Sequence, residues 1–368
     1  MTVEATAAAC PRCASPLVPE DQFCESCGAP VGVAPVPAAG AAAAEELPAG
    51  LDSARTRLII PAPSEPGQDP APVRHCASCA GLVDETGYCT VCGVKAAAER
   101  DHFRETPSGW TGGVCDRGRR HHRNEDAMAS AADDEPGSFA ALVVCDGVSS
   151  SPDSDRASLA AARAARDVLA AAHAERPADP VAYWTEALGR AGEAAQAEAR
   201  AAFVGEGTDS PSCTFVATVL AGPVLVTGNV GDSRAYWLPD EGPAVQLTED
   251  DSWVTEQVRQ GVPREVAETD HRAHAITRWL GADSPDPVPR CVATTATGPG
   301  WLLVCSDGLW NYCSPAADLR DLVRERAAAD ATPTAVAAAL VDFANAAGGQ
   351  DNVTVVLARV PAAVPPSD

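Results

Sequence analysis

The stretch Phe139–Gly147, FAALVVCDG, is an uninterrupted apolar run that ends in an aspartate and a glycine. A short apolar run that stops at turn-forming residues is typical of a buried strand. The pattern recurs at residues 301–308 as WLLVCSDG, where Asp307 and Gly308 close the run. The sequence therefore predicts two buried strands that each deliver a carboxylate at their end.

Further segments of the same kind extend this pattern along the chain. Strands are expected at 139–145, 213–221, 224–230, 234–238, 301–306 and 352–360, and helices at 153–175, 179–203 and, as a pair, 317–347. Strands grouped with strands and helices with helices favour a layered α+β domain over an alternating parallel sheet. We expect this domain to span residues 110–361, followed by a tail at 362–368.

Composition narrows the class of protein. Of the 368 residues 46% are hydrophobic but only 5% aromatic, so the core must be built mainly from Ala, Val and Leu. The 27 basic and 51 acidic side chains give a net charge of −24. This charge is the wrong sign for binding nucleic acid or an anionic membrane, and it suits divalent cations.

Location and source are also expectations from composition. No run of 18 or more apolar residues is present, and the N-terminus lacks the character of a signal peptide. We therefore expect a cytoplasmic protein. Abundant Ala and Arg with scarce Lys suggest a genome rich in G and C, and hence a bacterial source.

Eight of the 14 cysteines form four Cys-x-x-Cys pairs before residue 93. They fall into two similar segments, 8–32 and 74–96, each with an acidic turn, an aromatic residue before the third Cys and a Gly after the fourth. Four thiolates at this spacing predict one structural zinc ion per segment, as in a short zinc ribbon. Exchange of ligands between the two segments stays open. The expected zinc ligands are Cys10, Cys13, Cys24, Cys27, Cys76, Cys79, Cys89 and Cys92.

The segments around these ribbons are expected to be tethers. Residues 33–73 are rich in Ala and Pro, and residues 97–109 form a second predicted linker. The acidic balance of residues 1–100 favours a protein partner for the ribbons over DNA or RNA. The six remaining cysteines lie mostly in apolar runs, so we expect small buried thiols there.

Carboxylates gather at the ends of the expected strands. Asp146, Asp232, Asp307 and Asp351 hold such positions, and Glu125 with Asp126 precedes the first of them. Clustered carboxylates repel one another, so they stay ionised mainly when cations share them. Ligation by oxygen alone favours Mg²⁺ or Mn²⁺ over zinc. A single carboxylate at a strand end is more often a turn former, and for Asp232 that alternative stays open.

Eight blocks in order carry a resemblance to a known family: RHHRNEDA, VVCDGVSS, SCTFVA, GNVGDSRAYWL, LTEDDS, ITRWLG, LLVCSDGLWN and GGQDNVTVVL. Together they resemble the metal-dependent protein serine/threonine phosphatases of the PPM type, also called type 2C, over about residues 110–360. The resemblance implies a four-layer α/β/β/α sandwich of two antiparallel sheets. It also implies hydrolysis of phosphoserine and phosphothreonine in proteins by water activated at two Mn²⁺ or Mg²⁺ ions. The substrate would be a Ser/Thr kinase or one of its targets.

Roles are carried over residue by residue. The resemblance assigns metal contacts to Glu125, Asp146, Gly147, Asp307, Asp351 and, for a third ion, Asp232. In that assignment Asp146 bridges both ions, Asp307 and Asp351 hold the first, and Glu125 holds the second. Asp126 and Asn352 lie behind these ligands, while Asp209 and Asp251 are lesser candidates for the third ion.

The sequence departs from the family where phosphate should bind. The family has an arginine four residues before the metal-binding glutamate, and here that residue is His121. Because the nonreacting phosphate oxygens need a cation, we expect His121 or Arg123 to bind them, and Arg120, just before His121, stays open as an alternative. A His121→Arg change should then raise activity or flatten its pH dependence. The loop VSSSPDS after Gly147 also lacks the family's glycines, so a weakly catalytic phosphatase-fold scaffold or phosphoprotein-binding regulator is the alternative.

Overall fold

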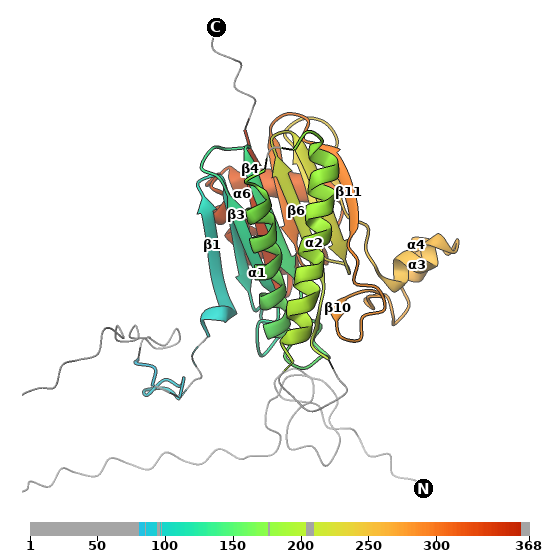
Figure 1. Cartoon of the computed structure of the whole chain (residues 1–368). Coiled ribbons are helices and arrows are strands. Elements are labelled where there is room, and N and C mark those ends of the chain that lie inside the picture. Colours follow the sequence, from blue (N-terminus) through green and yellow to red (C-terminus); the bar gives the residue numbers. More distant parts are fainter. Residues whose placement is uncertain are drawn as a thin grey trace, which may run out of the picture. The chain divides into compact units, whose positions relative to one another are not determined.

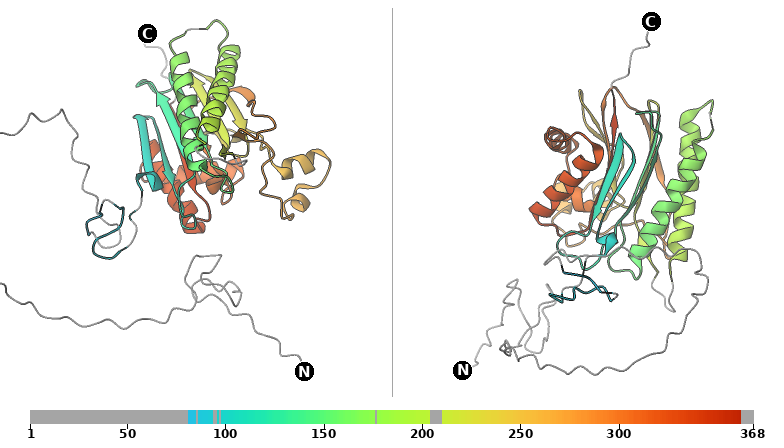
Figure 2. Two further views of the ribbon diagram at one scale, coloured as in Figure 1. Left: turned by 60° about the horizontal axis from the view of Figure 1, so that its bottom comes forward. Right: turned by 90° about the vertical axis from the view of Figure 1, so that its left-hand side faces the viewer.

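The computed structural model describes residues 81–361 with the exception of 85, 94, 95, 97, 176 and 204–209. Two antiparallel sheets stack face to face in this part of the chain, and a pair of long helices covers the outer face of each (Figures 1 and 2). The predicted four-layer sandwich of two antiparallel sheets is therefore confirmed. The predicted segments 8–32 and 33–73 and the tail at 362–368 lie outside the described residues.

One sheet has six strands in the order β1-β2-β13-β12-β8-β9. Their bounds are His102–Ser108, Thr111–Asp116, Val353–Val360, Gly300–Cys305, Arg234–Pro239 and Val245–Gln246. Strands β12 and β13 are buried along almost their whole length because one face meets the other sheet and the other face meets helices. That double burial explains their continuous apolar sequences.

The other sheet has five strands in the order β11-β7-β6-β4-β3. Their bounds are Arg290–Thr295, Val224–Val230, Phe215–Ala221, Phe139–Cys145 and Ala127–Ala132. A small pair, β5 (Ser212–Cys213) with β10 (Leu280–Gly281), extends this side of the domain. The apolar run FAALVVC forms β4, which is fully buried and pairs with β3 on one side and β6 on the other.

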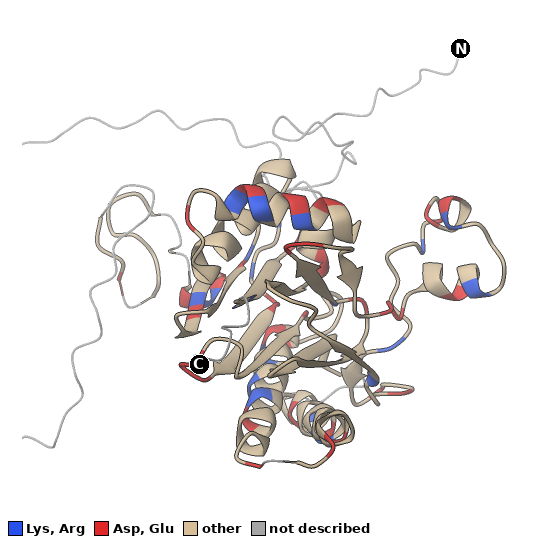
Figure 3. Cartoon of the chain, turned by 90° about the horizontal axis from the view of Figure 1, so that it is seen from above, with Lys and Arg blue, Asp and Glu red and all other residues tan. Residues whose placement is uncertain are grey.

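The helices divide between the two outer faces. Helices α1 (Ser154–Ala172) and α2 (Pro180–Ala201) pack on the five-stranded sheet, and α6 (Ala316–Ala327) and α7 (Pro333–Ala347) pack on the six-stranded one. The short helices are η1 (Glu99–Asp101), α3 (Trp253–Arg259), α4 (Arg264–Ala267) and α5 (Asp307–Trp310). Charged side chains concentrate on helices and loops, and the strands carry few (Figure 3).

Alanine sets the packing of the first helical layer. Ala157, Ala161 and Ala165 recur on the buried face of α1, and Ala187, Ala191 and Ala195 do so on α2. Residues spaced by four lie on one face of a helix, and a methyl group there lets two helices approach closely. The core is thus built from small aliphatic side chains, as the composition indicates.

The predicted linker at 97–109 is wrong. It contains η1 and the edge strand β1, which pairs with β2 in antiparallel register. Residues along β1 alternate between exposed and half-buried, and Pro107 interrupts the register near its end. An edge strand of this kind buries too little apolar surface to leave a recognisable run in the sequence.

The cysteine predictions have a mixed outcome. Cys115, Cys145, Cys213 and Cys305 are fully buried as predicted, whereas Cys291 and Cys313 are half-buried. Of the eight expected zinc ligands only Cys89 and Cys92 belong to the described residues. The zinc sites stay a prediction.

The structure describes part of the predicted second zinc segment, and this part is a tight cysteine turn. Cys89 forms a β-bridge with Val83. The amide of Val91 donates a hydrogen bond to Cys89 Sγ at 3.4 Å. Gly93 follows with a φ of +69°, a left-handed conformation that glycine adopts readily.

No helix among the described residues is long and apolar enough to cross a membrane.

Candidate active site

Strand ends from both sheets bring the predicted carboxylates together. Asp146 follows β4 of the five-stranded sheet, Asp307 opens α5 directly after β12, and Asp351 precedes β13 of the six-stranded sheet. Asp232 lies in the turn between β7 and β8. The site is therefore built from both sheets at one end of the sandwich.

Repulsion among these groups is strong. Burial raises the pKa of Asp146 well above its usual range, and the charges of Asp126, Asp307, Asp351 and Asp232 raise it further. Burial likewise raises the pKa of Asp307, with added repulsion from Asp351, Asp232 and Asp126. Like charges at short range disfavour ionisation, so a cation bound among these carboxylates would relieve the repulsion.

Two buried carboxylate oxygens have no hydrogen-bond partner in the described part of the chain. Asp126 is fully buried, and its Oδ2 accepts hydrogen bonds from Ser306 and Thr354, both at 2.7 Å. Its Oδ1 has no partner, and the same holds for Oδ1 of Asp307. Asp307 Oδ2 accepts only from Asn311 Nδ2, at 3.1 Å. Burial raises the pKa of Asp126 to about 6.

Within the described residues, no three His, Cys, Asp or Glu side chains are arranged so as to hold a metal ion. The carboxylates would therefore have to shift to enclose one. Their mutual repulsion and the two unpartnered oxygens are nevertheless the features that a bound cation relieves. The donors are oxygen atoms, the type that Mg²⁺ and Mn²⁺ prefer.

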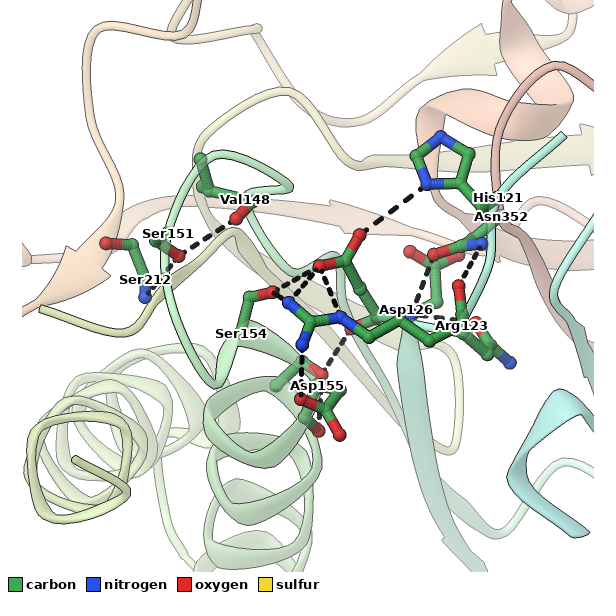
Figure 4. A network of polar contacts seen from close by, with 12 residues as sticks. His121, Arg123, Asp126, Val148, Ser151, Ser154, Asp155, Ser212 and Asn352 are labelled. Carbon is green, nitrogen blue, oxygen red and sulfur yellow. Dashed lines mark hydrogen bonds and ion pairs between the residues drawn. The ribbon is translucent and has the colours of Figure 1, made fainter. Parts of the chain in front are cut away.

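Glu125, two residues before β3, is held by a dense hydrogen-bond network, and its partners His121, Arg123 and Ser154 are labelled in Figure 4. Its Oε1 accepts from Arg123 Nη2 and from Ser154 Oγ, both at 2.7 Å. Burial alone would raise the pKa of Glu125, but hydrogen bonds from His121, Ser154 and Arg123 lower it to about 2. Glu125 is thus an ionised carboxylate fixed in one orientation.

His121 lies between two predicted metal ligands. Its Nδ1 is 3.5 Å from Glu125 Oε2, and its Nε2 is 3.1 Å from Asp351 Oδ1. The hydrogen bond with Glu125 raises the pKa of His121 against the effect of burial, and Asp351 raises it further. The imidazole is therefore at the carboxylate centre, and its role toward phosphate stays a prediction.

Arg123, the other predicted phosphate-binding residue, is half-exposed. Besides its contact with Glu125, its Nη1 lies 3.8 Å from Asp155 in α1. Its charge is therefore shared between two carboxylates, and 49% of the side chain remains exposed to solvent.

Asn352 connects three segments behind the site. Its Oδ1 accepts from the backbone amide of Glu125 at 2.7 Å. Its Nδ2 donates to the carbonyls of Arg117, at 2.7 Å, and Arg123, at 3.2 Å. A single amide side chain thereby fixes the backbone that carries Glu125.

A second residue, Arg100, supports the same backbone from the N-terminal side. Its Nε donates to the carbonyl of Asn124, and its Nη2 donates to the carbonyl of Asp126, both at 3.0 Å. Asn124 returns a bond from Nδ2 to the Arg100 carbonyl at 2.8 Å. No sequence pattern singled out Arg100, because its partners lie 24 and 26 residues away.

The glycines after two of the aspartates are required by close backbone approach. A Cβ atom on Gly308 would lie 1.9 Å from the carbonyl oxygen of Asn352, and one on Gly147 would lie 2.6 Å from that of Glu125. Contacts this short with backbone cannot be relieved by a side-chain rotation. The repeated Asp-Gly pairs thus report where the strand ends are pressed together.

Comparison with known proteins agrees with this geometry. The family model for protein phosphatase 2C matches residues 117–344. The chain belongs to this family. It is 32% identical to the serine/threonine phosphatase stp of Listeria innocua over 248 residues, which covers 66% of this chain and 92% of that protein. It is therefore a serine/threonine protein phosphatase of the 2C type.

Solved structures show the same architecture. The Mycobacterium tuberculosis serine/threonine phosphatase PstP/Ppp is 27% identical, covers 68% of this chain and 98% of its own, and superposes with a TM-score of 0.53. The Streptococcus agalactiae serine/threonine phosphatase, at 23% identity and a TM-score of 0.56, covers 70% of this chain and all of its own and supports the fold alone.

In this phosphatase Asp232 borders a second charged cluster. Arg234 makes a bidentate pair with Asp250, with Nε at 2.9 Å and Nη2 at 2.6 Å, and stacks on the Trp310 ring at 3.7 Å. The Trp310 Nε1 donates to the Asp232 carbonyl at 2.9 Å. Burial and the charge of Asp250, opposed by Arg234, raise the pKa of Asp232 to about 7.

Sequence reasoning missed the pairing of Arg234 with Asp250. The two residues lie 16 positions apart in separate blocks. The structure places Asp251, a lesser candidate for the third ion, between Arg278 at 3.0 Å and Arg290 at 2.7 Å. Asp251 is thus neutralised by arginines, and Asp209 lies outside the described residues.

Two cavities of the phosphatase adjoin the centre. One, of about 740 Å³, is lined by Asp232, Trp310 and residues of α3 and α4. The other, of about 510 Å³, begins at Val148, the residue after Gly147. His274 contributes to the lining of both, so they flank a common wall.

Proposed function

We propose that the domain hydrolyses phosphoserine and phosphothreonine in proteins at a centre where the carboxylates bind two Mn²⁺ or Mg²⁺ ions. The observation that carries the proposal is the pair of buried, unpartnered carboxylate oxygens on Asp126 and Asp307 within a mutually repelling cluster. The proposed ligands are Glu125, Asp146, the Gly147 carbonyl, Asp307 and Asp351, with Asp232 for a third ion. When bound, such ions activate water and offset the charge of the phosphate.

The protein side chains orient the metal ligand Glu125 and bind the substrate phosphate in this proposal. Glu125 is preorganised by Arg123, Ser154 and the backbone contact with Asn352. His121 and Arg123 are the cationic groups nearest to Glu125, so we assign them to the nonreacting phosphate oxygens. Ser149 and Ser150 follow Gly147 closely and supply further donors at the mouth of the site.

Phosphatase activity on a phosphothreonine peptide should require Mn²⁺ and be lost in EDTA. Asp307→Asn should lower kcat by at least two orders of magnitude and weaken Mn²⁺ binding in calorimetry. Asp134→Asn, at an exposed position between β3 and β4, is the matched control and should retain both properties. Turnover by the wild-type chain no greater than that of Asp307→Asn would favour the scaffold alternative.

We also propose that the two cysteine segments bind one structural Zn²⁺ ion each and recruit a protein partner. The amide hydrogen bond to Cys89 Sγ and the left-handed Gly93 are features that support a metal-binding cysteine turn. Elemental analysis should find two zinc ions per chain, and Cys89→Ser should remove one. A zinc content unchanged by Cys89→Ser would contradict the assignment of that ligand. The cytoplasmic location stays a prediction.

A further inference from the structure

The 510 Å³ cavity is built on the strand ends that carry the carboxylate centre. The amide of Val148 donates to the Ser212 carbonyl at 2.9 Å, and the amide of Thr214 donates to the Asp146 carbonyl at 2.7 Å. Val148, Ser151 and Ser212 lie beside the Glu125 network (Figure 4). A substrate whose phosphate reaches Asp146 therefore brings its neighbouring residues to the mouth of this cavity.

The hydroxyl groups of Ser151 and Ser212, which line the cavity, are already engaged. Ser151 Oγ donates to the Val148 carbonyl at 2.9 Å and accepts from the Ser212 amide at 3.1 Å. Ser212 Oγ donates to the Ser210 carbonyl at 3.1 Å. These bonds hold the loop after Gly147 in place, so they contribute to shape more than to recognition.

The lining offers a ligand one aromatic face, one carboxylate and the exposed imidazole of His274. Trp279 and Ile276 line the cavity, and Trp279 Nε1 donates to Asp283 Oδ1 at 3.0 Å. Asp283 is exposed, and it is the one Asp, Glu, Lys or Arg among the lining residues. Because the bond from Trp279 ties Asp283 to the indole, the carboxylate and the ring are presented together.

The neighbouring cation does not neutralise Asp283. Arg278 precedes Trp279 in the chain, but its guanidinium contacts Asp251 at 3.0 Å and Asp286 at 2.9 Å. With His274 counted as neutral, the lining carries one negative charge, in a chain whose net charge of −24 is counted in the same way. A tryptophan face beside a carboxylate attracts a side chain with an apolar stem and a cationic end.

We propose that this cavity binds an arginine or lysine side chain that lies close in sequence to the phosphorylated residue of the protein substrate. The stem would lie along Val148 and Ile276, and the cationic group would meet Trp279 and Asp283. The inference rests on the proposed phosphatase function and names a class of substrate for that same site.

The test compares phosphothreonine peptides that differ in one residue. Arg, Gln, norleucine or Glu is placed at each of the three positions on either side of the phosphothreonine. The full chain with Mn²⁺ should show, at one of these positions, a kcat/KM about five- to tenfold higher for Arg than for Gln. Norleucine should match Gln, since the apolar stem without the charge gains little.

Variants of Asp283 separate charge from structure. Asp283→Asn keeps an acceptor for Trp279 and should reduce the Arg to Gln ratio to below twofold. Asp283→Lys should turn the preference toward Glu. The ratio should fall in Trp279→Leu and stay at the wild-type value in Asp134→Asn, whose side chain is remote in sequence and exposed.

The outcomes distinguish this inference from the proposed function. Failure of the wild-type chain to hydrolyse p-nitrophenyl phosphate or any peptide would count against the phosphatase function itself. Three results would each overturn the basic-residue subsite: equal rates for the Arg, Gln, norleucine and Glu peptides at all six positions, an equal gain from norleucine, or an Arg preference that survives Asp283→Asn.

Discussion

The metal-free phosphatase should lose stability as the pH rises through neutrality, and Asp232 should account for much of the loss. The pKa of this buried carboxyl is raised from 3.8 to about 7. Below pH 3.8 it is protonated in both the folded and the unfolded state. At higher pH the unfolded chain releases the proton while the folded protein keeps it, so ionisation favours unfolding until about pH 7.

The size of the loss in unfolding free energy follows from the pH range over which stability can be measured. Between pH 5 and pH 7 the folded protein retains the proton across about two pH units, and each unit corresponds to about 1.36 kcal/mol. The contribution of Asp232 to the loss of unfolding free energy is therefore on the order of 3 kcal/mol. Asp146 and Asp307 add to the loss in the wild-type chain, so the difference between variants isolates Asp232.

Urea denaturation in EDTA at pH 5, 6 and 7 measures this difference. Asp232→Asn should show a smaller loss over this range than the wild-type chain, by about 3 kcal/mol. Asp134→Asn should parallel the wild type. Added Mn²⁺ should restore wild-type stability at pH 7, because a cation offsets the repulsion. Parallel curves for wild type and Asp232→Asn would refute a carboxyl that holds its proton near neutrality.

Three further predictions concern packing and charge. Gly308→Ala should lower the unfolding free energy by about 2 kcal/mol or more, because the added methyl group meets the Asn352 carbonyl. Gly109 has open space around it, so the control variant Gly109→Ala should change the unfolding free energy little in the same urea titration. Arg234→Met should lower the unfolding free energy by about 3–5 kcal/mol, because it leaves the Asp250 carboxylate buried without its partner. The double variant Arg234→Met with Asp250→Leu should recover most of that loss. A loss below about 1 kcal/mol for the single variant would contradict the pairing. His121→Arg should raise kcat/KM several-fold at pH 8.5 and flatten its pH profile between 6 and 9, since arginine keeps its charge where histidine, even with a raised pKa, loses it. A wild-type profile retained by His121→Arg would assign the phosphate contact to Arg123 or Arg120.

The strands that the sequence identified are those buried on both faces. β4 lies between α1 and the other sheet, and β12 and β13 lie between the five-stranded sheet and the helices α5 to α7, so nearly every residue in them is apolar. Such a run is readable from a single sequence because burial itself requires it. The Ala-rich helices α1 and α2 were predicted to within a few residues for the same reason.

The strands that were missed carry residues dictated by close packing or by the sheet edge. In β2, a Cβ on Gly112 would lie 2.1 Å from Thr334 Oγ1, and one on Gly113 would lie 2.7 Å from Met128 Sδ. Glycine is needed there although it disfavours strands, so the local sequence predicts a loop. β11 is an edge strand whose last four residues are exposed, and it has no apolar run to detect.

In the candidate site, too, the sequence predicted some residues and missed others. Asp146, Asp232, Asp307 and Asp351 were predicted because each stands at the end of a strong strand, and the first three also lie beside a glycine. Their hydrogen-bond partners were not predicted, because Ser154, Ser306 and Thr354 reach Glu125 and Asp126 from segments 29 to 228 residues away. A hydroxyl residue has no local signature for such a role, and only the folded backbone reveals it.

The hydrogen bonds of Arg100 connect the start of the phosphatase domain with its candidate active site. Arg100 stands only eight residues after Cys92, and it grips the carbonyl groups on both sides of Glu125. Tension applied to the chain from the N-terminal side would therefore fall on these two bonds before it reached the sheets. The backbone that follows the predicted second zinc segment is therefore joined directly to the backbone of Glu125, so partner binding by the cysteine segments, as proposed above, would act on the carboxylate centre through Arg100.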